Sequence, residues 1–343
     1  MGEYYKRGRK IREFILHSIS NHPQDIVSRV VNSFGISRQA ANRYVQKLLA
    51  EGCISAEGRT RQRTYSLRII HKSNFSAPLA GLEEDRLWEE RIVDIFNGLP
   101  TNVLDIWHYS FTEMVNNAID HSNGKELTVA VEMNGFLATI SIHDDGVGIF
   151  RKIKEECKLE DERHAVLELA KGKLTTDPDS HTGEGIFFTS RMLDDFAILS
   201  GEVYFSHKFG KEEDWILERE RPGTGTSVFM SLPNQSPRTA QEVFECFASE
   251  KEGYGFTKTV IPVRLVRHGV ENLVSRSQAK RLLGRVDRFK TVILDFEDVN
   301  SIGRAFADEI FRVFERNHPS ILLIPTNTVK SVEKMIALSK GRD

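Results

Sequence analysis

The feature that most constrains this chain is a helical pattern at residues 111–122, with the sequence Phe-Thr-Glu-Met-Val-Asn-Asn-Ala-Ile-Asp-His-Ser. Glu113, Asn117 and His121 are spaced by four, so each is turned only about 40° from the previous one and all three share one stripe. A carboxylate, an amide and an imidazole on one stripe can hold a hydrated divalent cation and orient a water. The alternative is the ordinary solvated face of an amphipathic helix.

The length of 343 residues predicts two or three domains rather than one core. No apolar run approaches the roughly 18 residues of a membrane helix, and residues 1–12 lack the apolar core of a signal peptide. We therefore expect a cytoplasmic protein with no membrane partner. Cys53, Cys157 and Cys246 are too far apart for a paired metal motif or a disulfide framework.

Positive charge is concentrated at the start of the chain. Residues 1–68 hold 13 lysines and arginines against five acidic residues, a net charge of +8. Because the whole chain carries −2, the remainder carries −10. The first segment is therefore the candidate for binding a polyanion.

Residues 9–20, 25–34 and 38–51 have helical apolar periodicity, with a glycine turn before the third. Short strands then flank a basic turn, and the pattern resembles the winged helix-turn-helix family over about 60 residues. The resemblance implies binding of duplex DNA through residues 1–70. The alternative is a helical unit for dimerisation or protein contact. The candidate DNA contacts are Arg38, Gln39, Asn42, Arg43, Arg59, Arg61 and Arg63.

The middle of the chain starts after residues 73–78, which we interpret as a linker. Residues 126–143 alternate apolar and polar, and Asn134-Gly135 predicts a hairpin turn between two strands. The second strand runs into Asp144. Two glycines, Gly146 and Gly148, follow it, and because they have no side chains the backbone there is open to close approach.

A long connection of 34 residues separates Gly148 from Gly183. It contains one predicted helix, residues 153–171, and a polar segment, which together are typical of a lid. Gly183 and Gly185 then open another helix, whose free N–H groups can bind phosphate, although such glycines also occur as simple caps. Strands at residues 202–208, 215–219 and 226–233 complete the pattern.

Four motifs now stand in order, E-x-x-x-N-x-x-x-H, D-x-G-x-G, G-x-G and G-T-x-x-x-x-x-L-P. They resemble those of the GHKL ATPase superfamily, which includes DNA gyrase, heat-shock chaperones, histidine kinases and bacterial anti-sigma serine kinases, over residues 85–233. The resemblance implies a Bergerat-type α/β sandwich, with helices on one face of a mixed sheet. It also implies that Mg²⁺ and ATP are bound.

The resemblance implies a role for each matching residue. Asn117 would hold the Mg²⁺, Glu113 would polarise the attacking group, and Asp144 would accept a hydrogen bond from the adenine amino group beside Thr226. Lys173 and His181 are candidate lid contacts, and a solvated lysine and a structural histidine are the alternatives. The implied nucleotide contacts are Asn117, Asp144, Gly146, Gly148, Lys173, His181, Thr182, Gly183, Glu184, Gly185 and Thr226.

The tail alternates strands and helices, which predicts an α/β layer. Strands are expected at residues 257–266, 290–296 and 321–325, with helices at 275–288 and 303–317 and a last one after Asn327. The tail is similar to STAS-like anti-sigma antagonists, although Gly303 and Arg304 stand where that family has its phosphorylated serine. The nearest hydroxyl is that of Ser301.

The whole chain is thus expected to be α/β (α+β), with a winged helix in residues 1–72, an ATPase domain in 80–234 and a STAS-like domain in 240–343. This is similar to a bacterial group of ATP-binding regulators. ATP binding or hydrolysis would be coupled to DNA and to a protein partner of the STAS-like domain, and a homodimer is possible. The alternatives are an anti-sigma-type serine kinase and a switch that holds ATP without hydrolysing it.

Overall fold

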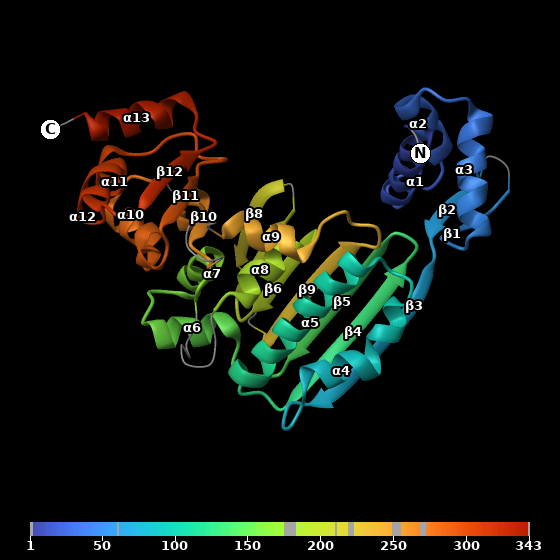
Figure 1. Ribbon diagram of the computed structural model, residues 1–343, viewed down its shortest axis with the longest axis horizontal. Coiled ribbons are helices and arrows are strands. Elements are labelled where there is room, and N and C mark those ends of the chain that lie inside the picture. Colours follow the sequence, from blue (N-terminus) through green and yellow to red (C-terminus); the bar gives the residue numbers. More distant parts are fainter. Residues whose placement is uncertain are drawn as a thin grey trace.

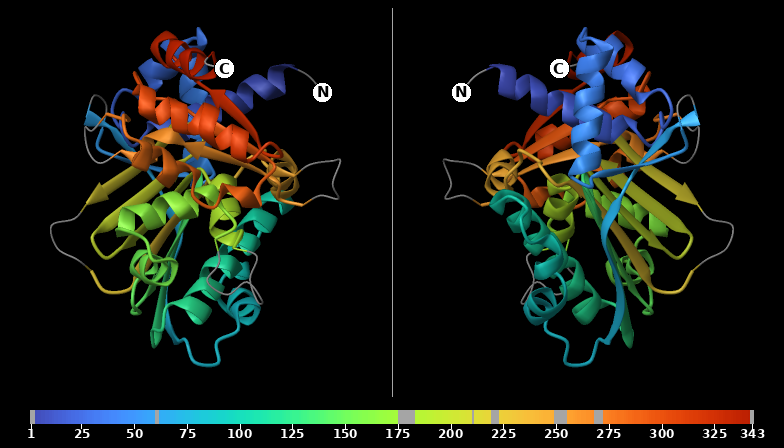
Figure 2. Two further views of the ribbon diagram at one scale, coloured as in Figure 1. Left: turned by 90° about the vertical axis from the view of Figure 1, so that its left-hand side faces the viewer. Right: turned by 90° about the vertical axis from the view of Figure 1, so that its right-hand side faces the viewer.

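The structure, a computed structural model, consists of three units that follow one another along the chain (Figure 1). The N-terminal and C-terminal units lie at opposite ends of the longest axis, and Figures 1 and 2 show both above a large central sheet. No helix among the described residues is both long enough and apolar enough to cross a membrane. The structure describes residues 3–59, 62–174, 183–209, 211–218, 223–248, 255–267 and 272–341.

The N-terminal unit is three helices followed by an antiparallel hairpin. Gly35 ends the second helix in the left-handed region, at φ 61°, and the hydroxyl of Ser37 accepts a hydrogen bond from Ala40 N at the start of the third. The apolar faces of the helices form a core of their own. The elements are α1 (Glu3–Ser18), α2 (Ile26–Phe34), α3 (Arg38–Ala50), β1 (Ile54–Glu57) and β2 (Thr64–Leu67).

The interpretation of residues 73–78 as a linker was wrong. These residues belong to β3 (Ile69–Pro78), which pairs antiparallel with β4 (Glu126–Asn134) at the edge of the central sheet. Serine, asparagine and proline favour a loop locally, but Phe75 pairs with Val129 and packs on the core, so tertiary contacts decide. Only Arg68 separates β3 from the hairpin strand β2. The N-terminal unit therefore continues directly into the central sheet.

The central sheet has seven strands in the order β3-β4-β5-β9-β6-β7-β8. A mixed sheet was expected, but every described strand pair is antiparallel, because β9 runs opposite to both of its neighbours. The strand at 195–200 was missed in the sequence. The remaining strands are β5 (Leu137–Asp144), β6 (Asp195–Ser200), β7 (Val203–Lys208), β8 (Lys211–Glu218) and β9 (Thr226–Pro233).

Helices cover one face of this sheet, as Figure 1 shows. Trp107 and Phe111 on the longest helix are fully buried, and so are Val129 and Ile140 on the strands below. Antiparallel sheets commonly have one packed and one open face, so this is an α+β arrangement. The helices of this layer are α4 (Glu84–Arg91), α5 (Thr101–His121) and α8 (Gly185–Met192).

The single helix predicted at residues 153–171 is two helices, α6 (Ile149–Cys157) and α7 (Glu162–Lys171). Lys158 takes a left-handed conformation at φ 53° and ends the first. The carboxylate of Asp161 accepts a hydrogen bond from His164 N and starts the second. The spacing of apolar residues alone does not reveal such a break between two helices.

The C-terminal unit is a parallel sheet in the order β10-β11-β12 with helices packed against it. The first expected strand is shorter than predicted and ends at Pro262, and the helix predicted at 303–317 contains a π-helical stretch at Glu309–Phe314. This core is continuous with that of the central unit. The elements are β10 (Lys258–Pro262), α10 (Arg276–Leu283), β11 (Thr291–Asp295), α11 (Arg304–Asp308), α12 (Glu315–Asn317), β12 (Leu322–Thr326) and α13 (Lys330–Lys340). The helix before them, α9 (Ala240–Phe247), packs on α5 and α8 of the central unit.

The hairpin between β4 and β5 makes a second contact between the N-terminal and central units. Phe136 at its tip packs on the N-terminal core, with its ring 6.1 Å from that of His17. A Cβ atom on Gly135 would lie 2.5 Å from Cys53 Cβ, so only glycine fits this approach. The sheet and the N-terminal unit are thus joined both through the chain and through packing.

We predict that Gly135→Ala loosens this contact and exposes Cys53. Overpacking costs about 1–3 kcal/mol, so labelling of Cys53 by iodoacetamide should become roughly tenfold faster. Peptide mass spectrometry measures the rate, with Cys157 and Cys246 as internal references. Gly255→Ala is the matched control, because its Cβ would have its nearest neighbour at 3.9 Å. Equal Cys53 labelling in both variants would contradict the prediction.

Candidate functional site

A cavity of about 290 Å³ lies between α5, α6, α8 and the ends of β5 and β9. Four distant parts of the chain therefore meet at one place. Most of the nucleotide contacts implied by the sequence motifs line this cavity. They are Asn117, Asp144, Gly183, Glu184, Gly185 and Thr226, and the predicted catalytic residue Glu113 lines it as well.

The polar stripe of α5 forms one wall of the cavity. Glu113, Asn117 and His121 all line it, while Trp107 and Phe111 on the same helix are buried in the core. The amide nitrogen of Asn117 is buried and has no hydrogen-bond partner among the described residues. Because buried polar atoms are nearly always paired, this orphaned atom at a cavity wall points to a ligand.

Asp144 stands at the end of β5, where the strand pairing places it opposite Thr226 on β9. Its side chain is almost wholly buried, at 5% exposure. Oδ1 accepts hydrogen bonds from Gly146 N at 2.9 Å and from Thr226 N at 3.3 Å. Burial raises the pKa of Asp144, and these two N–H donors oppose that rise. A carboxylate has further lone pairs, which remain for a donor in the cavity.

Thr226 also fixes the start of α6, since its hydroxyl oxygen accepts a hydrogen bond from Ile149 N at 3.1 Å. Gly146 and Gly148 are not among the residues that line the cavity, and the expectation that they let the backbone pass close to a nucleotide stays a prediction. A Cβ on Gly146 would lie 2.1 Å from Ser122 O, and one on Gly148 would lie 2.7 Å from Ser200 Oγ. These glycines let the turn after β5 pack on its neighbours.

The first turn of α8 closes the opposite wall. A Cβ on Gly185 would lie 1.9 Å from Glu113 Oε2, so the carboxylate of Glu113 rests directly on the start of this helix. Helix N-termini attract negative charge, which explains why a carboxylate is stable there and why phosphate would be too. Burial raises the pKa of the neighbouring Glu184. Any side chain at position 185 would displace Glu113.

Lys173, one of the two predicted lid contacts, is not among the residues that line the cavity, whereas its neighbour Leu174 is. Lys173 Nζ donates to Arg288 O at 3.3 Å and lies 5.3 Å from the Phe289 ring centre, so this amine contacts the C-terminal unit. Its predicted role as a nucleotide contact stays a prediction. His181 and Thr182 lie outside the described residues.

Lys152 is a cavity residue that the sequence analysis missed. Its side chain is 16% exposed, and its Nζ donates to His121 O at 3.0 Å, which holds α6 against the end of α5. The sequence feature that could have predicted this is the spacing of Lys152 and Ile149, because residues three apart lie on the same face of a helix. A lysine at this wall adds positive charge to a cavity otherwise rich in carboxylates.

The candidate DNA contacts occupy the outer surface of the N-terminal unit. Arg38, Gln39 and Arg43 are exposed at the start of α3, Asn42 is half-buried, and Arg59 is exposed in the hairpin. The guanidinium of Arg63 lies 5.3 Å from the ring centre of Tyr65, and Arg61 is outside the described residues. These side chains do not line the small cavity.

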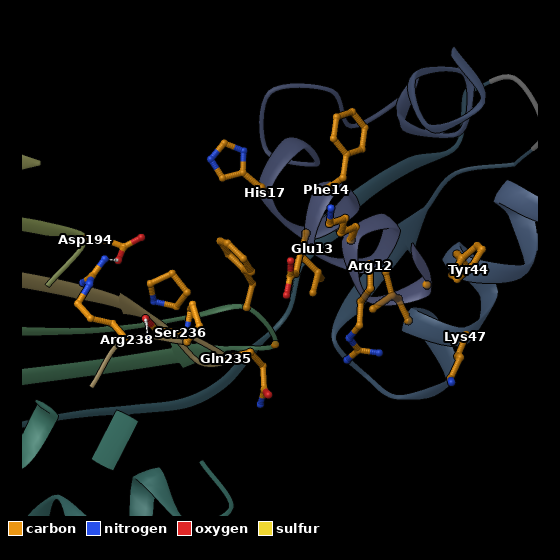
Figure 3. Close-up of a pocket in the computed structure, with 18 of the residues that line it drawn as sticks. Arg12, Glu13, Phe14, His17, Tyr44, Lys47, Asp194, Gln235, Ser236 and Arg238 are labelled. Atoms are coloured by element: carbon orange, nitrogen blue, oxygen red, sulfur yellow. Dashed lines mark hydrogen bonds and ion pairs between the residues drawn. The ribbon is translucent and has the colours of Figure 1, made fainter. Parts of the chain in front are cut away.

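A larger hollow of about 1420 Å³ lies between the N-terminal and central units (Figure 3). Figure 3 shows Phe14 and His17 on one side and Arg238 on the other. Two arginines of its walls are paired, Arg12 with Glu51 and Arg238 with Asp194. Of the four motifs it contains only Pro233, the last residue of the fourth, and it is open to solvent, so the smaller cavity is the better candidate for the functional site.

Comparison with known families also favours the smaller cavity as the functional site. Residues 104–236 match the model of the histidine kinase-, DNA gyrase B- and HSP90-like ATPases, a span that includes every described wall of the cavity. The chain contains a GHKL-type ATPase domain. Residues 278–333 match a STAS-like domain of unknown function. No curated protein matches the chain.

A GHKL-type domain implies nucleotide binding, usually with Mg²⁺, and the residues of the cavity fit both groups. The buried carboxylate of Asp144 can accept from a base. The unpaired Nδ2 of Asn117 can donate to a phosphate oxygen, and the oxygen of the same amide is of the type that a hard cation takes. No group of three or more acidic, histidine or cysteine side chains among the described residues could hold a metal alone. Mg²⁺ that is bound together with a nucleotide keeps several waters and takes oxygens from the phosphates.

We predict that Asp144→Asn stabilises the folded chain at neutral pH. A carboxyl group whose pKa is raised on folding favours the folded state at low pH, and this contribution is lost as pH rises through the raised value. The variant should therefore unfold at higher urea than wild type at pH 7, and the difference should shrink as pH falls toward about 4.

Asp145→Asn is the control of opposite sign. Asp145 accepts hydrogen bonds from Lys125 N and Glu126 N, and these donors lower its pKa. This variant should be less stable than wild type at pH 7, with the loss fading as pH falls. A lower urea midpoint for both variants at pH 7 would show that burial does not dominate at Asp144.

Proposed function

We propose that this chain binds Mg-ATP in the small cavity and couples its binding or hydrolysis to a DNA-binding N-terminal unit and to the STAS-like domain. The observation that carries the proposal is the convergence of the α5 stripe, Asp144, Thr226 and the start of α8 on one cavity with an orphaned buried amide. The match of residues 104–236 to an ATPase family supports it.

In this proposal each wall meets one part of the nucleotide. Asp144 accepts a hydrogen bond from the adenine amino group, with Thr226 beside it, and the first turn of α8 at Gly185 donates N–H groups to phosphate. Asn117 supplies the amide oxygen for the cation. Bound Mg²⁺ would neutralise charge on the phosphates. Glu113 polarises the attacking group. Its carboxylate lies at the start of α8, where the phosphates are proposed to bind.

DNA binding is proposed for the N-terminal unit because of its charge and its exposed arginines. Its net charge of +8 contrasts with −10 in the rest of the chain. Arg38 and Arg43 project from α3, which follows a glycine turn as in helix-turn-helix proteins. The direct step from β2 to β3 and the docked hairpin supply a physical path from the ATPase sheet to this unit.

The deciding experiment uses ATP labelled at the γ-phosphate. We expect the full chain to release free labelled phosphate, and Glu113→Ala to lose this release while it still binds ATP, because Glu113 acts on the attacking group and not on the base. Glu132→Ala removes a carboxylate of the open sheet face, paired with Lys72, and serves as control.

Other outcomes separate the rival functions. Label transferred to protein would indicate the serine kinase, and stoichiometric unhydrolysed ATP would indicate the switch. Absence of ATP binding by the wild-type chain would refute the proposal as a whole. Continued hydrolysis by the Glu113→Ala variant would remove Glu113 from its role.

For DNA binding, we expect the affinity of the full chain for duplex DNA to fall linearly with salt on logarithmic axes. Replacing Arg38 and Arg43 together with alanine should reduce the slope by about 0.9 for each phosphate contact that is lost. Arg304→Ala with Lys330→Ala removes equal charge from exposed positions of the C-terminal unit and is the control. An unchanged slope in the first variant would contradict DNA binding through α3.

A further inference from the structure

A buried lysine joins the ATPase domain to the STAS-like unit. Lys171 is the last residue of α7, and its side chain is only 2% exposed. Its Nζ donates to Glu168 Oε1 at 2.6 Å, to Arg281 O at 3.0 Å and to Gly284 O at 2.8 Å. An ammonium group has three donors, and all three are used.

The two carbonyl acceptors of Lys171 lie at the end of α10, in the STAS-like unit. The last carbonyls of a helix lack partners within it and carry partial negative charge, so a cation is favoured there. Burial lowers the pKa of Lys171, and Glu168 opposes that change. A buried cation with complete partners is a strong constraint, because any separation of α7 from α10 would remove two of its three acceptors and leave only Glu168.

The backbone next to Lys171 is fastened to the same unit. Thr259 Oγ1, on β10, donates to Lys171 O at 2.6 Å and is itself buried. Two residues later, Lys173 O accepts a hydrogen bond from the Arg288 guanidinium, while the Lys173 amine donates to Arg288 O. Residues 171–173 are thus held from both sides by the C-terminal unit.

These fastened residues lead directly into the wall of the cavity. Leu174 lines it, and a Cβ on Gly183 would lie 2.4 Å from the Leu174 carbonyl carbon, so these two residues touch across the intervening segment. Phe187, in α8, also lines the cavity, and its ring centre lies 4.7 Å from that of Phe256, which precedes β10. The STAS-like unit therefore contacts the part of the cavity wall that precedes residue 175 and the part that follows residue 182.

We infer that Lys171 is a positioning residue, through which the STAS-like unit holds the cavity wall in its nucleotide-binding position and regulates how long nucleotide stays bound. This inference rests on the proposed function. It gives the STAS-like unit a regulatory role: a protein bound there that moves α10 would open the wall. By linkage, nucleotide in the cavity tightens the contact between α7 and α10 to the same extent.

The test compares full-length Lys171→Met with wild type. Methionine keeps the bulk and removes the charge, so dissociation of a fluorescent ATP analogue should become faster by on the order of tenfold, a usual size for coupling between sites. Thr259→Val removes only the bond to Lys171 O and should act in the same direction; it carries the test if the first variant does not fold. Lys340→Met removes the 2.9 Å ion pair with Glu315 in the same unit and should dissociate like wild type.

A second readout separates positioning from mere stability. In wild type, ATP should slow hydrogen exchange of the amides of β10 and α10, and in Lys171→Met this protection should be lost. Wild-type dissociation rates together with retained protection in Lys171→Met and Thr259→Val would overturn the inference while leaving ATP binding intact. Failure of the wild-type chain to bind ATP would instead refute the proposed function from which the inference starts.

Discussion

The central architecture depends on the placement of β9 between β5 and β6. This strand pairs with both neighbours along its length, so it joins the first half of the sheet to the second. The pairing with β5 sets Thr226 opposite Asp144, although 81 residues separate them in the chain. Without β9 the two sheet halves would have no common edge. The bonds from Thr226 to Asp144 and from Ile149 N to Thr226, which shape the floor of the cavity, would also be absent.

The two flanking units are attached to this sheet in different ways. The N-terminal unit keeps its own core and meets the sheet at an edge strand and a hairpin tip. The C-terminal unit shares its core with the central unit and meets the helices beside the cavity. A cluster of phenylalanines, Phe187, Phe188, Phe244, Phe247, Phe256 and Phe289, fills that junction. The central unit thus has a strand path to one neighbour and a helix path to the other.

Buried polar groups in this chain fall into two classes by how completely they are paired. Lys171 uses every donor it has, and such a group serves to hold two units together, since the cost of desolvating an ion is of the order of several kcal/mol. Asn117 is half-buried and has a buried, unpaired amide nitrogen at a cavity wall, and Asp144 is buried with its pKa raised. Buried groups left short of partners in a cavity are typical of ligand sites.

Local patterns in the sequence determined the elements whose signals are short-range. The stripe of Glu113, Asn117 and His121 followed from helical spacing, the hairpin at Asn134 from turn chemistry, and the helix start at Gly185 from its glycines. Long-range packing decided the rest. Residues 73–78 became a strand because β4 offered a pairing edge, and α6 and α7 separated because Asp161 could cap a new helix. Lys152 and Lys171 have no motif, and only the approach of α5 and α10 shows what their amines meet. Spacing along the chain fixes which face a side chain is on, whereas the partner of that face lies far away in sequence and is known only once the chain is folded.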